Sequence, residues 1–105
     1  MDWQLSPEAL RERLARGEPL VLVDVREPWE VAIARIPGSL NIPLGDLAER
    51  HEELDRAATH VLVCHHGVRS MHALGLLRHF GFERLKNLAG GIEAWSEIDP
   101  STPRY

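Results

Sequence analysis

The chain has 105 residues, 44% hydrophobic and 27% charged, a composition typical of a soluble globular protein with one domain. Its net charge of −4 and the lack of any Lys/Arg-rich block argue against nucleic acid as the main partner. No apolar run approaches the roughly 18 residues of a membrane span, and residues 1–4 do not resemble the start of a signal peptide. We therefore expect no membrane partner and one domain over residues 1–105, with its motif-bearing core at about 5–98.

The first third of the chain predicts a helix followed by a buried strand. Ser6 can cap a helix that begins at Pro7, because proline loses nothing by lacking a donor in the first turn, and Gly17 is placed to end that helix. The run Leu20–Val25 is apolar except for Asp24, as in a strand covered on both faces. The pattern further predicts a short helix over Pro28–Ala34, a turn at Pro37–Gly38 and a strand over Ser39–Ile42.

A second helix is expected to begin at Asp46, with Glu49 three residues later in a capping-box arrangement. Leu47 and Leu54 would form its buried side.

The second half alternates strand and helix in the same way. We expect strands over His60–Cys64 and Arg84–Leu88, helices over Ser70–Phe80 and Gly91–Ile98, and an extended C-terminal tail over Asp99–Tyr105. This alternation predicts an α/β open sandwich, with a mostly parallel central sheet and helices on both faces. Reactive groups in such folds lie at the carboxyl ends of the strands, and Cys64 falls at one.

Cys64 is the one cysteine of the chain, so an intramolecular disulfide is impossible. This favours a reducing compartment, and we expect a cytoplasmic protein. A lone cysteine is either a small buried hydrophobe or a reactive thiol. Here it closes a strand, and the next helix begins near Ser70. A thiolate at this place would face loop N–H groups and the positive end of that helix, and Arg69 would add its charge if it folds back.

The loop after Cys64 is therefore the candidate active site. Gly67 allows backbone angles that other residues avoid, so that several N–H groups can point inward. The sequence predicts Cys64 as the nucleophile of covalent catalysis. The remaining loop residues are expected to line the substrate site: His65, His66, Gly67, Val68, Arg69 and Ser70.

Four segments together resemble the rhodanese family, over about Leu5 to Tyr105. The loop Cys64–Arg69 resembles the family's active-site loop, which starts at a nucleophilic cysteine and ends in a basic residue. Asp24–Glu27 (DVRE) resembles the motif after an early strand, and Gly90–Ile92 with Trp95 resembles the closing motif. Ile36–Pro43 resembles a second signature, where the family usually has a preceding His and this chain has Arg35, which is also a hydrogen-bond donor.

The resemblance implies a rhodanese-like fold and a sulfurtransferase. Cys64 would take the outer sulfur of thiosulfate or a similar donor as a persulfide and pass it to cyanide, a thiol or a sulfur-carrier protein, with no cofactor. The loop from Cys64 to Arg69 has six residues. Related phosphatases and arsenate reductases have one more, so the loop length favours sulfur transfer over the phosphatase or arsenate reductase alternative.

Other interpretations compete with a free-standing enzyme. One is a module that delivers persulfide to a fixed protein partner, and another is an inactive binding domain, which the presence of Cys64 disfavours. A metal site at Cys64 and the histidines is disfavoured, because neighbouring loop residues point apart and no paired-cysteine spacing exists. Asp24 and Arg26 are expected to support the loop through hydrogen bonds rather than contact substrate. Arg69 would either contact substrate or only pair with a carboxylate such as Asp24.

Overall fold

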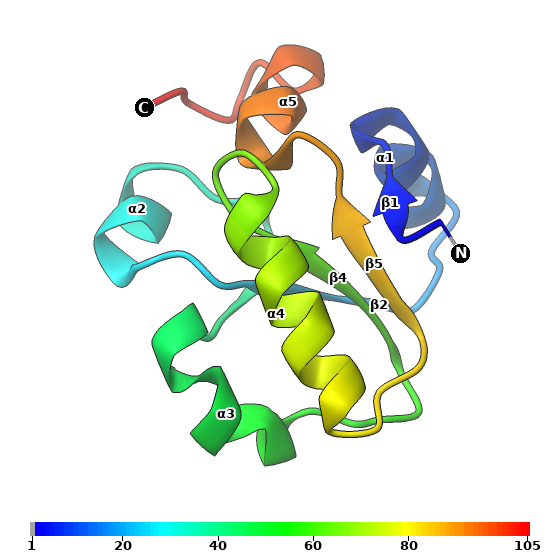
Figure 1. Cartoon of the computed structure of the whole chain (residues 1–105). Helices are drawn as coiled ribbons and strands as arrows, with labels where there is room; N and C mark the ends of the chain where they lie inside the picture. The colour runs from blue at the N-terminus through cyan, green and yellow to red at the C-terminus, as the bar shows by residue number, and fades with distance from the viewer. Residues whose placement is uncertain (1) are drawn as a thin grey trace.

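The computed structural model describes residues 2–105, which form a five-stranded sheet in the order β1-β5-β4-β2-β3 (Figure 1). Every pair of neighbouring strands is parallel, which confirms the predicted α/β class. The strands are β1 (Gln4–Leu5), β2 (Leu20–Asp24), β3 (Leu40–Asn41), β4 (Thr59–Val63) and β5 (Leu85–Leu88). The helices are α1 (Pro7–Ala15), α2 (Pro28–Ile33), α3 (Leu47–Arg50), α4 (Val68–His79) and α5 (Gly91–Ile98).

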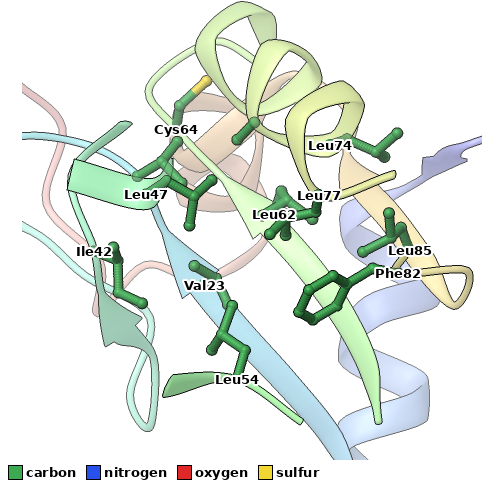
Figure 2. Packing of buried hydrophobic residues seen from close by; sticks show 12 residues of the cluster. Val23, Ile42, Leu47, Leu54, Leu62, Cys64, Leu74, Leu77, Phe82 and Leu85 are labelled. Atoms are coloured by element: carbon green, nitrogen blue, oxygen red, sulfur yellow. The ribbon is translucent and has the colours of Figure 1, made fainter. Parts of the chain in front are cut away.

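Each face of the sheet packs against its own pair of helices. Leu62 and Cys64 point to the face covered by α3 and α4, where Figure 2 shows the packed side chains. Val61 and Val63 point to the other face and pack with residues of α1 and α5. Burial on both faces explains why β4 is apolar at consecutive positions instead of alternating. Cys64 lies at the carboxyl end of β4 and belongs to the core on the α3 and α4 side.

Several expected elements are confirmed together with their local causes. The hydroxyl of Ser6 accepts a hydrogen bond from the backbone N–H of Ala9 (3.1 Å), which caps α1 as predicted. Helix α4 begins two residues earlier than expected, at Val68, because Gly67 is its N-cap with φ of +100°. This left-handed conformation favours glycine. The earlier start brings the helix terminus closer to Cys64.

The segment after Pro43 differs from the single capped helix predicted there. The backbone N–H of Asp46 already donates to the Pro43 carbonyl (2.9 Å), so Asp46 lies inside a 3₁₀ turn and its side chain caps nothing. The segment is a 3₁₀ turn, the four residues of α3 and a second 3₁₀ turn. Leu47 and Leu54 are nevertheless buried as expected, since a 3₁₀–α–3₁₀ succession also places them inward.

The structure also differs from the predicted elements at the two ends of the described chain. Strand β1 was not predicted, because Gln4 and Leu5 are too short a pair to show any periodicity. The tail is not wholly extended, since Asp99 accepts hydrogen bonds from Ser101 and Thr102 and closes a turn. Beyond that turn, the tail passes from α5 toward α2 (Figure 1). Among residues 2–105, no helix is long and apolar enough to cross a membrane.

Candidate active site

Cys64 directly follows β4 and is almost fully buried, with 1% of its surface exposed. Its Sγ accepts a hydrogen bond from the backbone N–H of Gly67 (3.0 Å) and lies 3.2 Å from the hydroxyl oxygen of Ser70. Both groups can donate to an anionic sulfur, and Ser70 lies in the first turn of the twelve-residue helix α4. Gly67 and Ser70 are therefore the groups that contact the sulfur, one through its backbone N–H and the other through its hydroxyl.

The start of α5 holds the first part of the loop. The backbone N–H of Ile92 donates to the Cys64 carbonyl (2.9 Å), and that of Glu93 donates to the His65 carbonyl (3.1 Å). A Cβ atom on Gly91 would lie 2.5 Å from the carbonyl oxygen of Cys64 and still closer to that of His65. Gly91 also has φ of +63°. The closing glycine motif therefore lets the helix end approach the backbone on which the nucleophile sits.

Arg69 pairs with Glu30 of α2. Its two terminal nitrogens donate to the two carboxylate oxygens at 2.8 and 2.9 Å, a bidentate arrangement. The hydrogen bonds from Arg69 lower the pKa of the buried Glu30 carboxyl to about 2, and the same pair raises the pKa of Arg69. The carboxylate partner of the Arg69 guanidinium is Glu30 rather than Asp24.

Asp24 and Arg26 form a buried ion pair at 2.6 Å. Arg26 also donates to the Ala34 carbonyl (2.6 Å) and, at 3.4 Å, to the Glu30 carbonyl. Arg26 therefore bonds to Asp24 and to carbonyls within α2 and at its C-cap, and its connection to the Cys64 loop is indirect, through Glu30 and the partner of Glu30, Arg69.

Tyr105 joins these elements from the far end of the described chain. Its hydroxyl accepts a hydrogen bond from Arg26 (2.8 Å) and donates to Glu30 (2.9 Å). Its ring stacks on His65 with the centroids 4.1 Å apart. Sequence reasoning missed Glu30 and Tyr105. Glu30 is one acid in an unremarkable short helix, and Tyr105 is separated by 75 positions from the carboxylate that it contacts.

The remaining loop side chains lie at the rim. His65 and His66 stack with ring centroids 4.0 Å apart, His65 being half-buried and His66 exposed. Burial, and to a smaller extent His66, lowers the pKa of His65. The side chain of Val68 is 78% exposed. Within residues 2–105, no three His, Cys, Asp or Glu side chains converge as metal ligands.

The arrangement combines a buried thiol, donors aimed at its sulfur and an arginine at the loop end, as expected for a thiolate nucleophile. A model of the rhodanese-like domain matches residues 6–98 of the sequence. The chain belongs to the rhodanese family. This match includes the loop and the Asp24–Glu27 and Gly90–Ile92 motifs, so that family membership accounts for all segments on which the resemblance was based.

Rhodanese relatives are found among full-length proteins and solved structures. The chain is 38% identical over 93 residues to a protein named sulfurtransferase from Allochromatium vinosum, covering 89% of this chain and 87% of that protein. It is 34% identical to the Arabidopsis thaliana adenylyltransferase and sulfurtransferase MOCS3, covering 97% of this chain and 26% of MOCS3. The structure of human single-domain sulfurtransferase TSTD1 superposes with a TM-score of 0.81 at 31% identity, covering 94% of this chain and 99% of the human one.

Proposed function

We propose that this rhodanese domain transfers sulfane sulfur through a persulfide on Cys64. The observation that carries the proposal is the pair of donors on Cys64 Sγ, the N–H of Gly67 at 3.0 Å and the hydroxyl of Ser70 at 3.2 Å. Both groups can donate a hydrogen bond to a thiolate sulfur, and the thiolate is the nucleophilic form of cysteine. The names of its relatives support sulfur transfer as the reaction.

The proposed reaction has two displacements at sulfur. In the first, the Cys64 thiolate attacks the outer sulfur of thiosulfate or a similar donor, a new S–S bond forms, and the donor's S–S bond breaks as sulfite leaves with the electron pair. In the second, an acceptor thiolate or cyanide attacks the outer sulfur of the persulfide, and Cys64 leaves as a thiolate. No electrons are gained or lost overall, so that no redox cofactor is required.

The six-residue loop supports sulfur over a larger group. The N–H of Gly67 contacts Sγ at 3.0 Å, so the loop backbone lies close to the thiol. One additional sulfur atom needs less space inside this loop than a tetrahedral oxyanion does. We therefore expect no hydrolysis of aryl phosphates. The reaction also needs a free thiol, which is maintained in a reducing compartment, and we propose the cytoplasm.

A second candidate is delivery of the persulfide to one protein partner. The match to a quarter of MOCS3, which is named for an adenylyltransferase as well as a sulfurtransferase activity, favours this candidate. The two candidates differ in the acceptor, not in the role of Cys64. A free-standing enzyme should turn over thiosulfate and cyanide at about 1 per second or faster, whereas a delivery module should be far slower with these small molecules.

The experiment that tests the function is mass spectrometry of the intact protein after incubation with thiosulfate. We expect a gain of one sulfur atom, which cyanide or a reducing agent removes. Because Cys64 is the only cysteine, the adduct has one place to form, and Cys64→Ser should show neither adduct nor turnover. Full activity in Cys64→Ser, or no sulfur gain by the wild-type protein from any sulfane donor, would contradict the proposal.

A further inference from the structure

Asn87 is a buried amide directly beneath the Cys64 loop. It lies on β5 with 1% of its surface exposed, between the half-buried Lys86 and the buried Leu88. Its Nδ2 donates to the side-chain oxygen of Gln4 (2.9 Å) and to the backbone carbonyl of Gly67 (3.3 Å). Its Oδ1 has no hydrogen-bond partner within residues 2–105. Burying an amide oxygen without a hydrogen-bond partner costs free energy, which raises the question of what the bonds of the amide nitrogen contribute.

The orientation of this amide follows from its neighbours. The carbonyl of Gly67 only accepts hydrogen bonds, and therefore the Asn87 atom that faces it must be the nitrogen. Gly67 is close-packed on this side, because a Cβ there would lie 3.5 Å from Asn87 Nδ2 and 3.4 Å from the backbone nitrogen of Gly90. Asn87 thus donates to the Gly67 carbonyl from the sheet side and adds to the first hydrogen bond of α4, which the carbonyl of an N-cap residue also accepts.

Holding that carbonyl also orients the next N–H group. The bond between Gly67 and Val68 is trans, so the Val68 N–H points opposite to the Gly67 carbonyl and away from Asn87. Val68 is the first residue of α4, and its N–H therefore has no partner within the helix. This N–H therefore points away from Asn87, and it is the next along the chain after the N–H of Gly67 that contacts Sγ.

We propose that Asn87 is a positioning residue for sulfur transfer, which holds the Gly67 carbonyl so that the N–H groups of Gly67 and Val68 face the sulfur carried by Cys64. The inference rests on the proposed function and adds to it a residue that touches neither the sulfur nor the donor. The competing role is structural, in which Asn87 only ties β5 to β1 through Gln4.

The test compares Asn87→Ala with Gln4→Ala. Both changes remove the bond between the two side chains, but only Asn87→Ala also removes the bond to Gly67. Two quantities are measured on folded protein: the rate of sulfur loading from thiosulfate, and the pH profile of Cys64 alkylation by iodoacetamide. For Asn87→Ala we expect loading about tenfold slower and an alkylation profile moved to higher pH by up to about one unit, the low end for a hydrogen bond to a charged group. Gln4→Ala should stay within twofold of wild type in both.

Asn87→Thr is the second variant, since threonine has a similar size, suits a β-strand and lacks the amide. It should behave like Asn87→Ala, and it decides the question if the alanine variant does not fold. Wild-type kinetics and an unmoved profile in a folded Asn87 variant would overturn the inference, as would equal effects of the Gln4 and Asn87 changes. If wild-type protein takes no sulfur from any donor, the proposed function fails, and the alkylation profile still decides the role of Asn87.

Discussion

Gly91 at the start of α5 has both a positive φ and a close contact with the backbone of Cys64 and His65, and replacing it with alanine should show how much each contributes to stability. Gly91 has φ of +63°, which any side chain adopts at a cost of about 1 kcal/mol or more. In addition, the new Cβ would lie 2.5 Å from the Cys64 carbonyl oxygen, and its nearest neighbours are all backbone atoms of Cys64 and His65. Backbone cannot rotate away as a side chain can, so the helix end and the loop must move apart.

Gly17→Ala is the matched control, because Gly17 has a similar φ of +75° and no atom within 4 Å of the position of a new Cβ. We expect it to lower the free energy of unfolding by about 1 kcal/mol. Gly91→Ala should lower it by a further 1–3 kcal/mol or so, as overpacking does. For a domain of this size that difference corresponds to a fall in Tm of roughly 4 to 20 °C.

Denaturant unfolding of both variants measures the difference directly. The rate of Cys64 alkylation should also change in Gly91→Ala, because its new methyl group displaces the carbonyls that flank the nucleophile, and it should be unchanged in Gly17→Ala. If the two variants lose the same stability, the close approach of α5 to the loop does not constrain the fold, and the reasoning is refuted.

Two further predictions concern the pair formed by Glu30 and Arg69. Because the pKa of Glu30 is lowered from 4.5 to about 2, its contribution to stability is complete above pH 4.5 and is lost as the pH falls toward 2. That contribution is about 2 kcal/mol, after a reduction for solvent screening at the partly exposed Arg69. The free energy of unfolding, measured from pH 5 to 2, should fall by this amount in wild type and in Glu53→Gln, which is the control for an exposed pair. It should fall much less in Glu30→Gln. An equal fall in all three proteins would contradict the assignment. Arg69→Ala should lower kcat/KM for thiosulfate about tenfold or more, since it leaves a buried carboxylate facing a dianion, and adding Glu30→Gln should restore part of the loss. No recovery in the double variant would show that Arg69 acts by contact with the donor and not by neutralising Glu30.

Local patterns in the sequence were sufficient for most of the fold. The runs Leu20–Val23 and Val61–Cys64 are apolar at consecutive positions, which requires cover on both faces and hence a parallel sheet between helices. Ser6 marks the start of α1 through a bond to a residue three positions away. Asp46 has the same type of pattern but caps nothing, because a turn that begins at Pro43 includes it. The capping signal at Asp46 therefore fails because a 3₁₀ turn precedes the helix.

By itself, the sequence determined that Cys64 closes a buried strand and begins a six-residue loop before a helix. Those relations are local, since each depends on residues within a few positions of one another. Only the tertiary structure decided that Arg69 pairs with Glu30, that Tyr105 bonds to both Arg26 and Glu30, and that Asn87 supports Gly67. These contacts join residues 20 to 79 positions apart, and the parallel sheet brings them together because its strands end at one edge whatever their separation along the chain.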